Sequence, residues 1–296
     1  MERRSYGASV LLLVTAAIWG TAFVAQRAGM ESVGPFTFNA ARFLLGALIV
    51  LPLAAGRLRR GATGSLTRRG TVGAIALCGG ILFGGSAMQQ IGLVTSSAGK
   101  AGFITGLYIV IVPLLETALG RRPAAGEIAG AAVSTAGLFL LTVTGDFSVA
   151  AGDLWVIGGA FLWAAHVVVV ARVSPRIDTF VLAAGQFLVT AFLSLGAALA
   201  VEGVAPSGLR AAAAPILYGG VLSVGIAYTL QVSAQKRVPP SLAAILMSLE
   251  SPFAAAAGWI ALGETLSARA LAGAALMLAG TTVAQLGPKR VSRAAP

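Results

Sequence analysis

A few ionisable side chains of this sequence stand inside long apolar runs. Arg42, Lys100, His166 and Glu250 are ionisable and each lies within such a run. In a hydrocarbon layer an ionised side chain costs about 2.5–3.5 kcal/mol on insertion scales, so it needs a partner, water or a role. At that depth a guanidinium or ammonium group could hold a carboxylate, and a carboxylate could hold an ammonium group.

Two roles stay open for these charges. Arg42 and Glu250 are expected about 10 Å and about 14 Å from the ends of their runs at the helical rise per residue, so they approach similar depths. They either pair and fix helix packing, or they bind the charge of a ligand. Lys100 is close to the start of its run, so it either snorkels to the headgroups or points into a cavity. Glu116, close to the end of the same run, is expected to snorkel as well.

His166 and Asn39 each share a helix face with another candidate. His166 follows Trp163 by three residues, and Arg42 follows Asn39 by three. Histidine titrates near neutral pH, so His166 could carry a proton, or it could be a neutral residue hydrogen-bonded inside the bundle. Asn39 and Arg42 could contact one ligand.

Neutral polar and aromatic residues complete the candidate ligand site. Polar candidates are Gln89, Tyr108, Gln186 and Tyr228, and apolar walls could come from Trp19, Phe103 and Trp163. For each aromatic residue, plain helix packing is the alternative.

Pro113 and Pro252 lie inside apolar runs, where each removes a backbone hydrogen bond and tends to kink its helix. They could act as hinges of a gate or as static bends.

Several kinds of site are excluded. With one histidine and one cysteine, Cys78, a zinc site or a Cys/His nucleophile pair is close to impossible. Phosphate-loop, dinucleotide and zinc-protease motifs are missing as well. We therefore expect no metal, no cofactor and no enzymatic activity. The net charge of +11 is scattered over short segments, which suits anionic lipids and not a nucleic-acid partner.

The apolar runs predict a multi-pass, all-α membrane protein. Hydrophobic residues make up 57% of the chain and charged residues 10%. A span needs about 20 mostly apolar residues to cross the hydrocarbon core. Ten spans are predicted near residues 8–28, 34–54, 71–92, 97–118, 127–144, 152–171, 179–200, 211–233, 241–261 and 269–286. The longest loop is expected between Gly56 and Gly70.

The basic residues predict the orientation of these spans. If both termini are cytoplasmic, sixteen of the 21 Lys and Arg residues fall inside: Arg3, Arg4, Arg57, Arg59, Arg60, Arg68, Arg69, Arg121, Arg122, Arg172, Arg176, Lys236, Arg237, Lys289, Arg290 and Arg293. Three fall outside, namely Arg27, Arg210 and Arg269. The positive-inside rule predicts this asymmetry.

The two halves of the chain resemble each other at an offset of 143–144 residues. Trp19 matches Trp163, and the tetrapeptide at 129–132 matches the one at 272–275. Residues 1–146 and 147–296 are therefore expected to be five-span repeats. An odd number of spans forces the second repeat to enter the membrane from the opposite side. Inverted repeats are typical of secondary transporters, which bind substrate near mid-membrane between the halves.

Over almost its whole length the sequence resembles the EamA-type branch of the drug/metabolite transporter superfamily. The resemblance lies in Ala17-Ile18-Trp19-Gly20, Ala40-Ala41-Arg42-Phe43, the run 98–103, Leu249-Glu250-Ser251-Pro252, Leu262-Gly263-Glu264-Thr265, Gly273 and Gly280. The first half departs from it, with Gly120-Arg121-Arg122 where the second has Gly263-Glu264-Thr265. The resemblance implies a ten-helix exporter of small metabolites in a bacterial inner membrane, similar to the YddG-type exporters of aromatic amino acids.

The expected function is secondary-active or facilitative export of a small molecule, with amino acids, aromatic ones included, as substrates. Arg42 or Lys100 would hold a carboxylate, Glu250 an ammonium group, and the tryptophans the apolar part. A broad-specificity drug exporter and an ion-coupled importer remain alternatives, and a membrane-embedded lipid enzyme is the class least supported. Membrane lipids are the other expected partners, and no oligomer is required.

Overall fold

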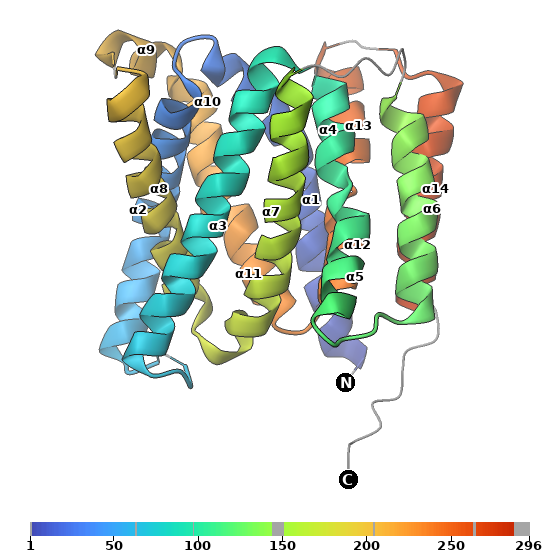
Figure 1. The fold of residues 1–296 in the computed structure, drawn as a ribbon, viewed down its shortest axis with the longest axis horizontal. Coiled ribbons are helices and arrows are strands. Elements are labelled where there is room, and N and C mark those ends of the chain that lie inside the picture. Colours follow the sequence, from blue (N-terminus) through green and yellow to red (C-terminus); the bar gives the residue numbers. More distant parts are fainter. Residues whose placement is uncertain are drawn as a thin grey trace.

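Helices account for nearly all of the structure. The computed structural model describes residues 2–62, 64–96, 98–143, 151–203, 205–262 and 265–286, which form a helical bundle (Figure 1). Ten spans in this part are long and apolar enough to cross a membrane. The prediction of ten membrane-spanning helices is thus confirmed.

Seven spans are single helices and three are composite. The single helices are α1 (Glu2–Met30), α2 (Pro35–Arg59), α3 (Arg68–Thr95), α6 (Ala125–Thr142), α7 (Ala151–Val173), α8 (Thr179–Val201) and α14 (Ala268–Leu286). The composite spans are α4 (Ala98–Gly106) with α5 (Tyr108–Ala118), α10 (Ala213–Leu217) with η2 (Tyr218–Tyr228) and α11 (Thr229–Gln235), and α12 (Pro240–Met247) with α13 (Glu250–Leu262). Two short helices remain: η1 (Ser174–Arg176) continues the end of the sixth span after α7, and α9 (Pro206–Ala211) lies between the seventh and eighth spans.

Several helices extend past the predicted spans. α2 continues to Arg59 and α3 begins at Arg68, so their connection is shorter than the loop expected between Gly56 and Gly70. The extra turns carry basic residues into the rim of the bundle. The hydropathy pattern could not include these turns because they contain charged side chains.

The helix breaks do not coincide with the prolines. The fourth span is interrupted at Leu107, whereas Pro113 lies inside α5. The ninth span is interrupted at Ser248 and Leu249, and Pro252 is the third residue of α13. A proline ring clashes with the carbonyl four residues earlier, which for Pro252 is Ser248. Pro252 therefore explains the break before it, but Pro113 has no matching break four residues upstream.

The eighth span contains a π-helical segment, η2, where the third span has regular α-helix throughout. Gly219, Gly220 and Gly225 lie in this segment. π-Helical turns inside α-helices frequently occur at functional sites.

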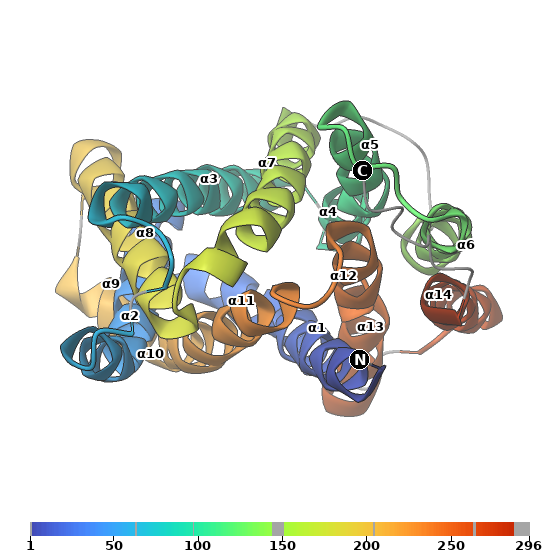
Figure 2. The same cartoon turned by 90° about the horizontal axis from the view of Figure 1, so that it is seen from below.

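The helices form paired contacts along the long axis of the bundle (Figures 1 and 2). α2 packs along α8 at one end of this axis, and α6 packs along α14 at the other. Between them, α3 packs on α7, and α1 packs on the eighth and ninth spans. We call the end where α1 begins and α14 ends the lower end, as it appears in Figure 1.

The α6–α14 contact is close because four glycines remove the side chains between the two backbones. A Cβ atom on Gly130 would lie 2.6 Å from the carbonyl oxygen of Gly280, and one on Gly137 would lie 2.6 Å from that of Gly273. Such contacts leave no space for a methyl group. Small residues at helix interfaces allow this kind of backbone approach in membranes.

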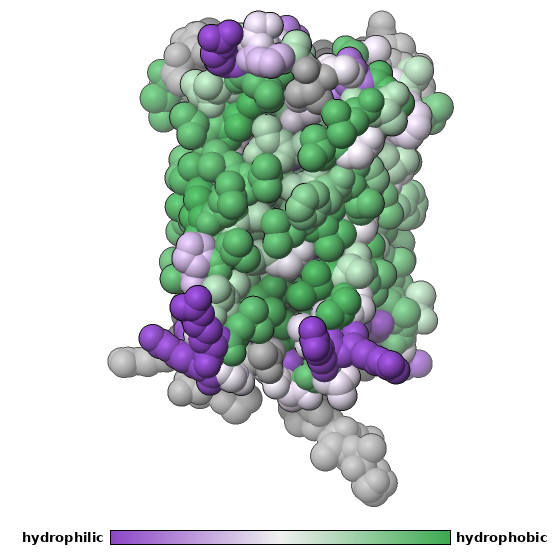
Figure 3. Space-filling view, turned by 90° about the vertical axis from the view of Figure 1, so that its left-hand side faces the viewer, coloured by the Kyte–Doolittle hydropathy of each residue, from purple (hydrophilic) through white to green (hydrophobic). Residues whose placement is uncertain are grey.

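The surface has the distribution expected of a membrane-spanning bundle. Figure 3 shows a broad apolar band between two rims, with strongly hydrophilic side chains concentrated at the lower rim. Basic residues at helix ends account for this rim, including Arg57, Arg59 and Arg68. The chain is therefore a multi-pass membrane protein.

Candidate functional site

A cavity lies between the helices in the middle and upper part of the bundle. Its empty volume is about 570 Å³, counting the part that opens to solvent. Its lining comes from both halves of the chain and consists of Trp19, Phe23, Gln26, Arg42, Gln89, Thr105, Tyr108, Trp163, His166, Val167, Ser223, Tyr228, Gln231, Met247 and Glu250.

Three aromatic rings form one wall of the cavity. Tyr228 lies between Trp19 and Trp163, with ring centroids 4.6 Å and 6.3 Å away, and it is stacked with Trp163 at an interplanar angle of 24°. Both indole N–H groups are already used. Trp19 donates to the carbonyl oxygen of Ser223 at 3.2 Å, and Trp163 donates to Gln89 Oε1 at 2.9 Å. The indoles are thereby fixed in orientation, and their remaining contribution to a ligand is apolar.

Arg42 is the cation of the cavity. It is 3% exposed and makes no ion pair with any carboxylate of the described residues. Its Nε donates to Asn39 Oδ1 at 2.9 Å, and its guanidinium carbon lies 4.9 Å from the Phe43 ring centroid. Burial of a guanidinium without an acidic partner costs free energy, and a ligand anion that pairs with Arg42 would offset this cost.

Glu250 is the acidic residue of the cavity. It is 7% exposed and is the first residue of α13, where the helix dipole favours a negative charge. The Tyr108 hydroxyl, just after the break in the fourth span, lies beside the carboxylate. Among the described residues Glu250 makes no ion pair. Of the two roles expected for Arg42 and Glu250, direct pairing is therefore not the one observed.

His166 lies at the same wall. Its ring packs edge-on against Trp163 and Tyr228, with centroids 6.3 Å and 6.2 Å away, which agrees with the helix face predicted for Trp163 and His166. Its Nε2 is 3.0 Å from Gln186 Oε1, and its Nδ1 has no partner in the described chain. Gln186 itself is fully buried and does not line the cavity.

Other polar atoms that line the cavity also lack partners. Thr105 Oγ1 and Gln231 Oε1 are buried and make no hydrogen bond within the described chain. An unsatisfied buried polar group costs about 1–3 kcal/mol. Water or the polar groups of a ligand would relieve this cost. The described ranges hold no group of three His, Cys, Asp or Glu residues that could bind a metal ion.

Eight of the predicted ligand-binding residues line the cavity, namely Trp19, Arg42, Gln89, Tyr108, Trp163, His166, Tyr228 and Glu250. Asn39 and Gln186 lie one layer behind, bonded to Arg42 and His166. Phe103 instead packs against Phe139, 6.1 Å between centroids. The side chain of Lys100 lies outside the described part of the structure.

Helical spacing could have found several lining residues that were not predicted. Phe23 and Gln26 follow Trp19 at four and seven residues, on one face of α1. Thr105 precedes Tyr108 by three residues, and Met247 precedes Glu250 by three. Val167 and Ser223 complete the set. Each lies within one or two turns of a residue that was predicted.

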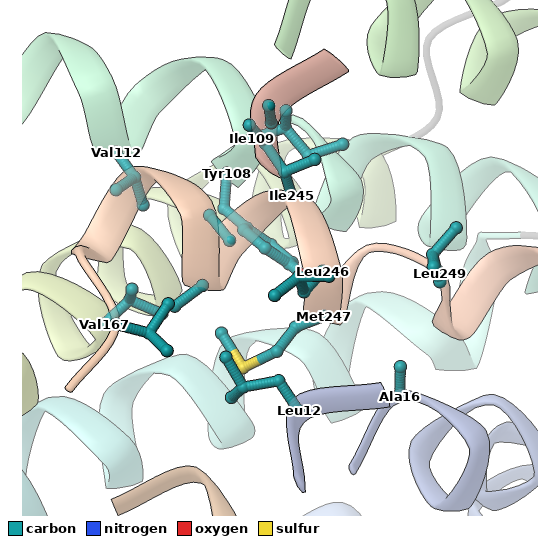
Figure 4. Packing of buried hydrophobic residues seen from close by; sticks show 14 of the residues in the cluster. Leu12, Ala16, Tyr108, Ile109, Val112, Val167, Ile245, Leu246, Met247 and Leu249 are labelled. Carbon is teal, nitrogen blue, oxygen red and sulfur yellow. The ribbon is translucent and has the colours of Figure 1, made fainter. Parts of the chain in front are cut away.

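Apolar side chains pack between the helices next to the cavity. Figure 4 shows this packing, with Leu12 from α1, Val112 from α5, Val167 from α7 and Met247 from α12. Met247 and Val167 also line the cavity, so they form its floor.

A polar cluster closes the rim below these apolar side chains. Glu116 in α5 accepts hydrogen bonds from the backbone nitrogen of Ser241, at 3.0 Å, and from its hydroxyl. Glu116 also pairs with Arg121, which contacts Glu127 at 3.5 Å. Glu116 was expected to snorkel to the headgroups, and that expectation is wrong. The residue is 2% exposed because α12 begins directly against it.

Known proteins with similar sequences and structures agree with this architecture. The model of the EamA-like transporter family matches residues 7–143 and again residues 150–285. A protein of Archaeoglobus fulgidus described as an uncharacterized transporter is 25% identical over 93% of this chain and 84% of its own length. A probable terminal-alkyne amino-acid exporter of Streptantibioticus cattleyicolor is 29% identical over 91% of this chain and 90% of its own.

A solved crystal structure superposes with a TM-score of 0.79 at 24% identity, covering 95% of this chain and 97% of the other. That likeness supports the fold. With the family model matching most of the chain in two copies, the sequence is that of a transporter and not of an enzyme. The chain belongs to the EamA-like transporter family of the drug/metabolite transporter superfamily.

Proposed function

We propose that this transporter exports small zwitterionic metabolites, with amino acids, aromatic ones included, as its substrates. The observation that carries the proposal is the presence of Arg42 and Glu250 in one buried cavity without an ion pair between them. Two opposite charges that are kept apart in a low-dielectric site match a ligand with two opposite charges of its own.

The chemistry of the lining supports each part of such a ligand. The guanidinium of Arg42 would take the carboxylate, because planar guanidinium groups bind carboxylates through two parallel hydrogen bonds. Glu250 would take the ammonium group, assisted by the free acceptor of Gln231. Trp19, Trp163 and Tyr228 would cover an apolar side chain. The Streptantibioticus cattleyicolor relative, named as a probable amino-acid exporter, favours the same substrate class.

We further propose that residues 1–146 and 147–296 are inverted repeats that exchange roles during transport. The helix contacts support this arrangement because they occur in pairs that interchange at the offset of 143–144 residues. At this offset α1 corresponds to α7, and the third and fourth spans correspond to the eighth and ninth. α3 packs on α7, and correspondingly α1 packs on the eighth span. α7 packs on the fourth span, and correspondingly α1 packs on the ninth. α2 with α8, and α6 with α14, are pairs that map onto themselves. The basic lower rim would be cytoplasmic by the positive-inside rule, here in a bacterial inner membrane.

The cavity in this state would face outward. Its lining reaches Gln26 and Gln89 near the upper ends of α1 and α3, whereas the layer around Leu12 and Met247 separates it from the lower rim. Alternating access would require the lower contacts, including the one between Glu116 and Ser241, to open while the upper ones close.

Uptake of labelled phenylalanine into liposomes that contain the purified protein tests the proposal. Saturable uptake without a pH gradient, lost in Arg42→Gln and Glu250→Gln, is the expected result. Arg27→Gln and Glu31→Gln are matched controls, because they remove the same charges from exposed positions. Unaltered uptake in both cavity variants would contradict the assigned roles.

The same assay separates the alternatives. Uptake that needs the pH gradient would favour an ion-coupled carrier. Transport of bulky lipophilic cations in place of amino acids would favour a broad drug exporter.

A further inference from the structure

Asn39 holds the guanidinium of Arg42 in one orientation. Arg42 Nε donates to Asn39 Oδ1 at 2.9 Å, and the two residues lie three apart on α2. Because arginine can only donate hydrogen bonds, the acceptor oxygen of the amide must face it, which fixes the amide orientation. The rings of Phe43 and Phe38 lie 4.9 Å and 5.6 Å from the guanidinium carbon. The terminal Nη edge of Arg42 is what remains for a ligand.

The amide orientation that this hydrogen bond requires leaves the amide nitrogen of Asn39 without a partner among the described residues. Asn39 is 0% exposed, and its Nδ2 has no partner in the described chain. A buried donor without a partner is unfavourable. An aspartate at this position would remove the unpaired donor and form an ion pair with Arg42, and an alanine would remove the polar group altogether. The aspartate would leave no unpaired donor, whereas the alanine would leave Arg42 Nε without its acceptor. Hydrogen bonding within the chain therefore does not by itself explain why the residue is asparagine and not aspartate.

A requirement for a neutral hydrogen-bond acceptor explains the asparagine. An aspartate would cancel the charge of Arg42, and an alanine would release the Arg42 side chain. We propose that Asn39 is a positioning residue that sets the charge selectivity of the cavity. It turns the Nη edge of Arg42 toward the ligand and leaves the positive charge uncompensated. The inference rests on the proposed function, in which Arg42 binds the ligand carboxylate.

Asn39 acts through Arg42 and not on the ligand, since it does not line the cavity. The second half offers a contrast at the position that matches Arg42. There, Gln186 is a buried amide that orients a neutral partner, His166 Nε2, at 3.0 Å. The cavity therefore has one cation from the first half, one anion from the second, and a net charge of zero, which favours a zwitterion over an amine.

Substitution of Asn39 by aspartate should invert this preference. With the introduced carboxylate paired to Arg42, Glu250 is the remaining free charge and the cavity prefers a cation. The quantity to measure is the dissociation constant for phenylalaninamide divided by that for phenylalanine. The two compounds differ in that phenylalaninamide has a neutral carboxamide in place of the carboxylate. Loss of one charge-assisted hydrogen-bonded contact corresponds to a change of about tenfold or more in this ratio.

The experiment is calorimetric titration of the full-length protein in nanodiscs with both compounds. The wild type should prefer phenylalanine. In Asn39→Asp the ratio should fall at least about tenfold, and in Asn39→Ala and Asn39→Ser it should fall by less, because Arg42 is released but not neutralised. Gln90→Glu is the matched control, an amide-to-acid change at a buried position outside the cavity lining, and its ratio should stay at the wild-type value.

The outcomes distinguish a failure of the positioning role of Asn39 from a failure of the proposed function. If the wild type prefers phenylalanine and the Asn39 variants that fold keep its ratio, the positioning role is overturned while the proposed function stands. If the wild type does not distinguish the two compounds, or binds neither, the proposed function fails and this inference fails with it. A general loss of affinity for both compounds at an unchanged ratio would show a structural role only and would also overturn the inference.

Discussion

Ser241 donates to the Glu116 carboxylate from both its backbone nitrogen and its hydroxyl, across 125 positions of sequence. Ser241 lies in the first turn of α12, where backbone N–H groups have no partner within the helix. A carboxylate from α5 thus caps a helix of the other half of the chain. The same carboxylate pairs with Arg121, so one residue joins three segments at the lower rim.

Removal of this charge should open the lower end. In a Cys78→Ser background, a cysteine placed at Val167 reports on the cavity floor, since Cys78 is the one native cysteine. We expect Glu116→Gln to raise the labelling rate of that cysteine several-fold when an impermeant maleimide is applied from the lower side. Glu127→Gln is the control, because Glu127 bonds Arg121 and Ala124 within its own half. Equal labelling in both variants would show that the Glu116 cap does not hold the lower end closed.

The α6–α14 contact has no space for an added methyl group. Gly137→Ala would place a Cβ 2.6 Å from the Gly273 carbonyl oxygen, and overpacking of this kind costs about 1–3 kcal/mol. The measurement is thermal unfolding in detergent. Gly80→Ala meets nothing within 4 Å and should be neutral or slightly stabilising, since alanine is the better helix former. A Gly137→Ala protein as stable as wild type would mean that α6 and α14 can move apart without loss of stability.

The aromatic wall should report ligand binding by fluorescence. Trp19 and Trp163 contact Tyr228 at the cavity, whereas Trp155 and Trp259 are exposed on the outer surface. Ligand-induced quenching is expected to persist in a Trp155→Phe/Trp259→Phe variant. It should weaken in Tyr228→Ala, which removes the ring between the two indoles, and Tyr228→Phe should restore it. Quenching lost in the surface variant would place the ligand elsewhere.

The upper rim contains a second cap between the halves. Glu202, after α8, accepts from the backbone nitrogens of Phe36 and Thr37 at 2.7 Å and 2.8 Å, and from the Thr37 hydroxyl at 2.7 Å. Loss of a helix N-cap costs about 0.5–2 kcal/mol, so Glu202→Ala should lower the midpoint of thermal unfolding. Glu31→Ala removes an exposed carboxylate and should have little effect. Equal midpoints for the two variants would show that this cap adds nothing to stability.

The sequence was enough to predict the spans but not where their ends and breaks fall. Ten apolar runs determine ten helices because an unpaired backbone cannot remain in hydrocarbon. The turns that lengthen α2 and α3 carry Arg57, Arg59 and Arg68, which hydropathy counts as loop. The π-helix of the eighth span and the break at Leu107 were not predicted, because neither interrupts the apolar run in which it lies.

The candidate site was predictable where rare residue types carried the information. Arg42 and Glu250 are conspicuous in an apolar chain, and both line the cavity. Thr105 and Met247 are common residues in helices, and only the assembled bundle shows that they face the same space. Glu116 was misjudged because its depth near a helix end suits snorkelling, and its cap on α12 is a tertiary contact.

The separate origins of Arg42 and Glu250 have a consequence for ancestry and for direction. If the halves are inverted repeats, as we propose, two identical five-helix chains assembled in antiparallel orientation would bring either two guanidinium groups or two carboxylates to the central cavity, and the like charges would repel each other. A site with one of each requires the halves to differ in sequence. Joining such halves in a single polypeptide ensures that the unlike copies meet, and under the proposed alternating access it would let the two entrances of the carrier evolve unequal affinities for the same solute.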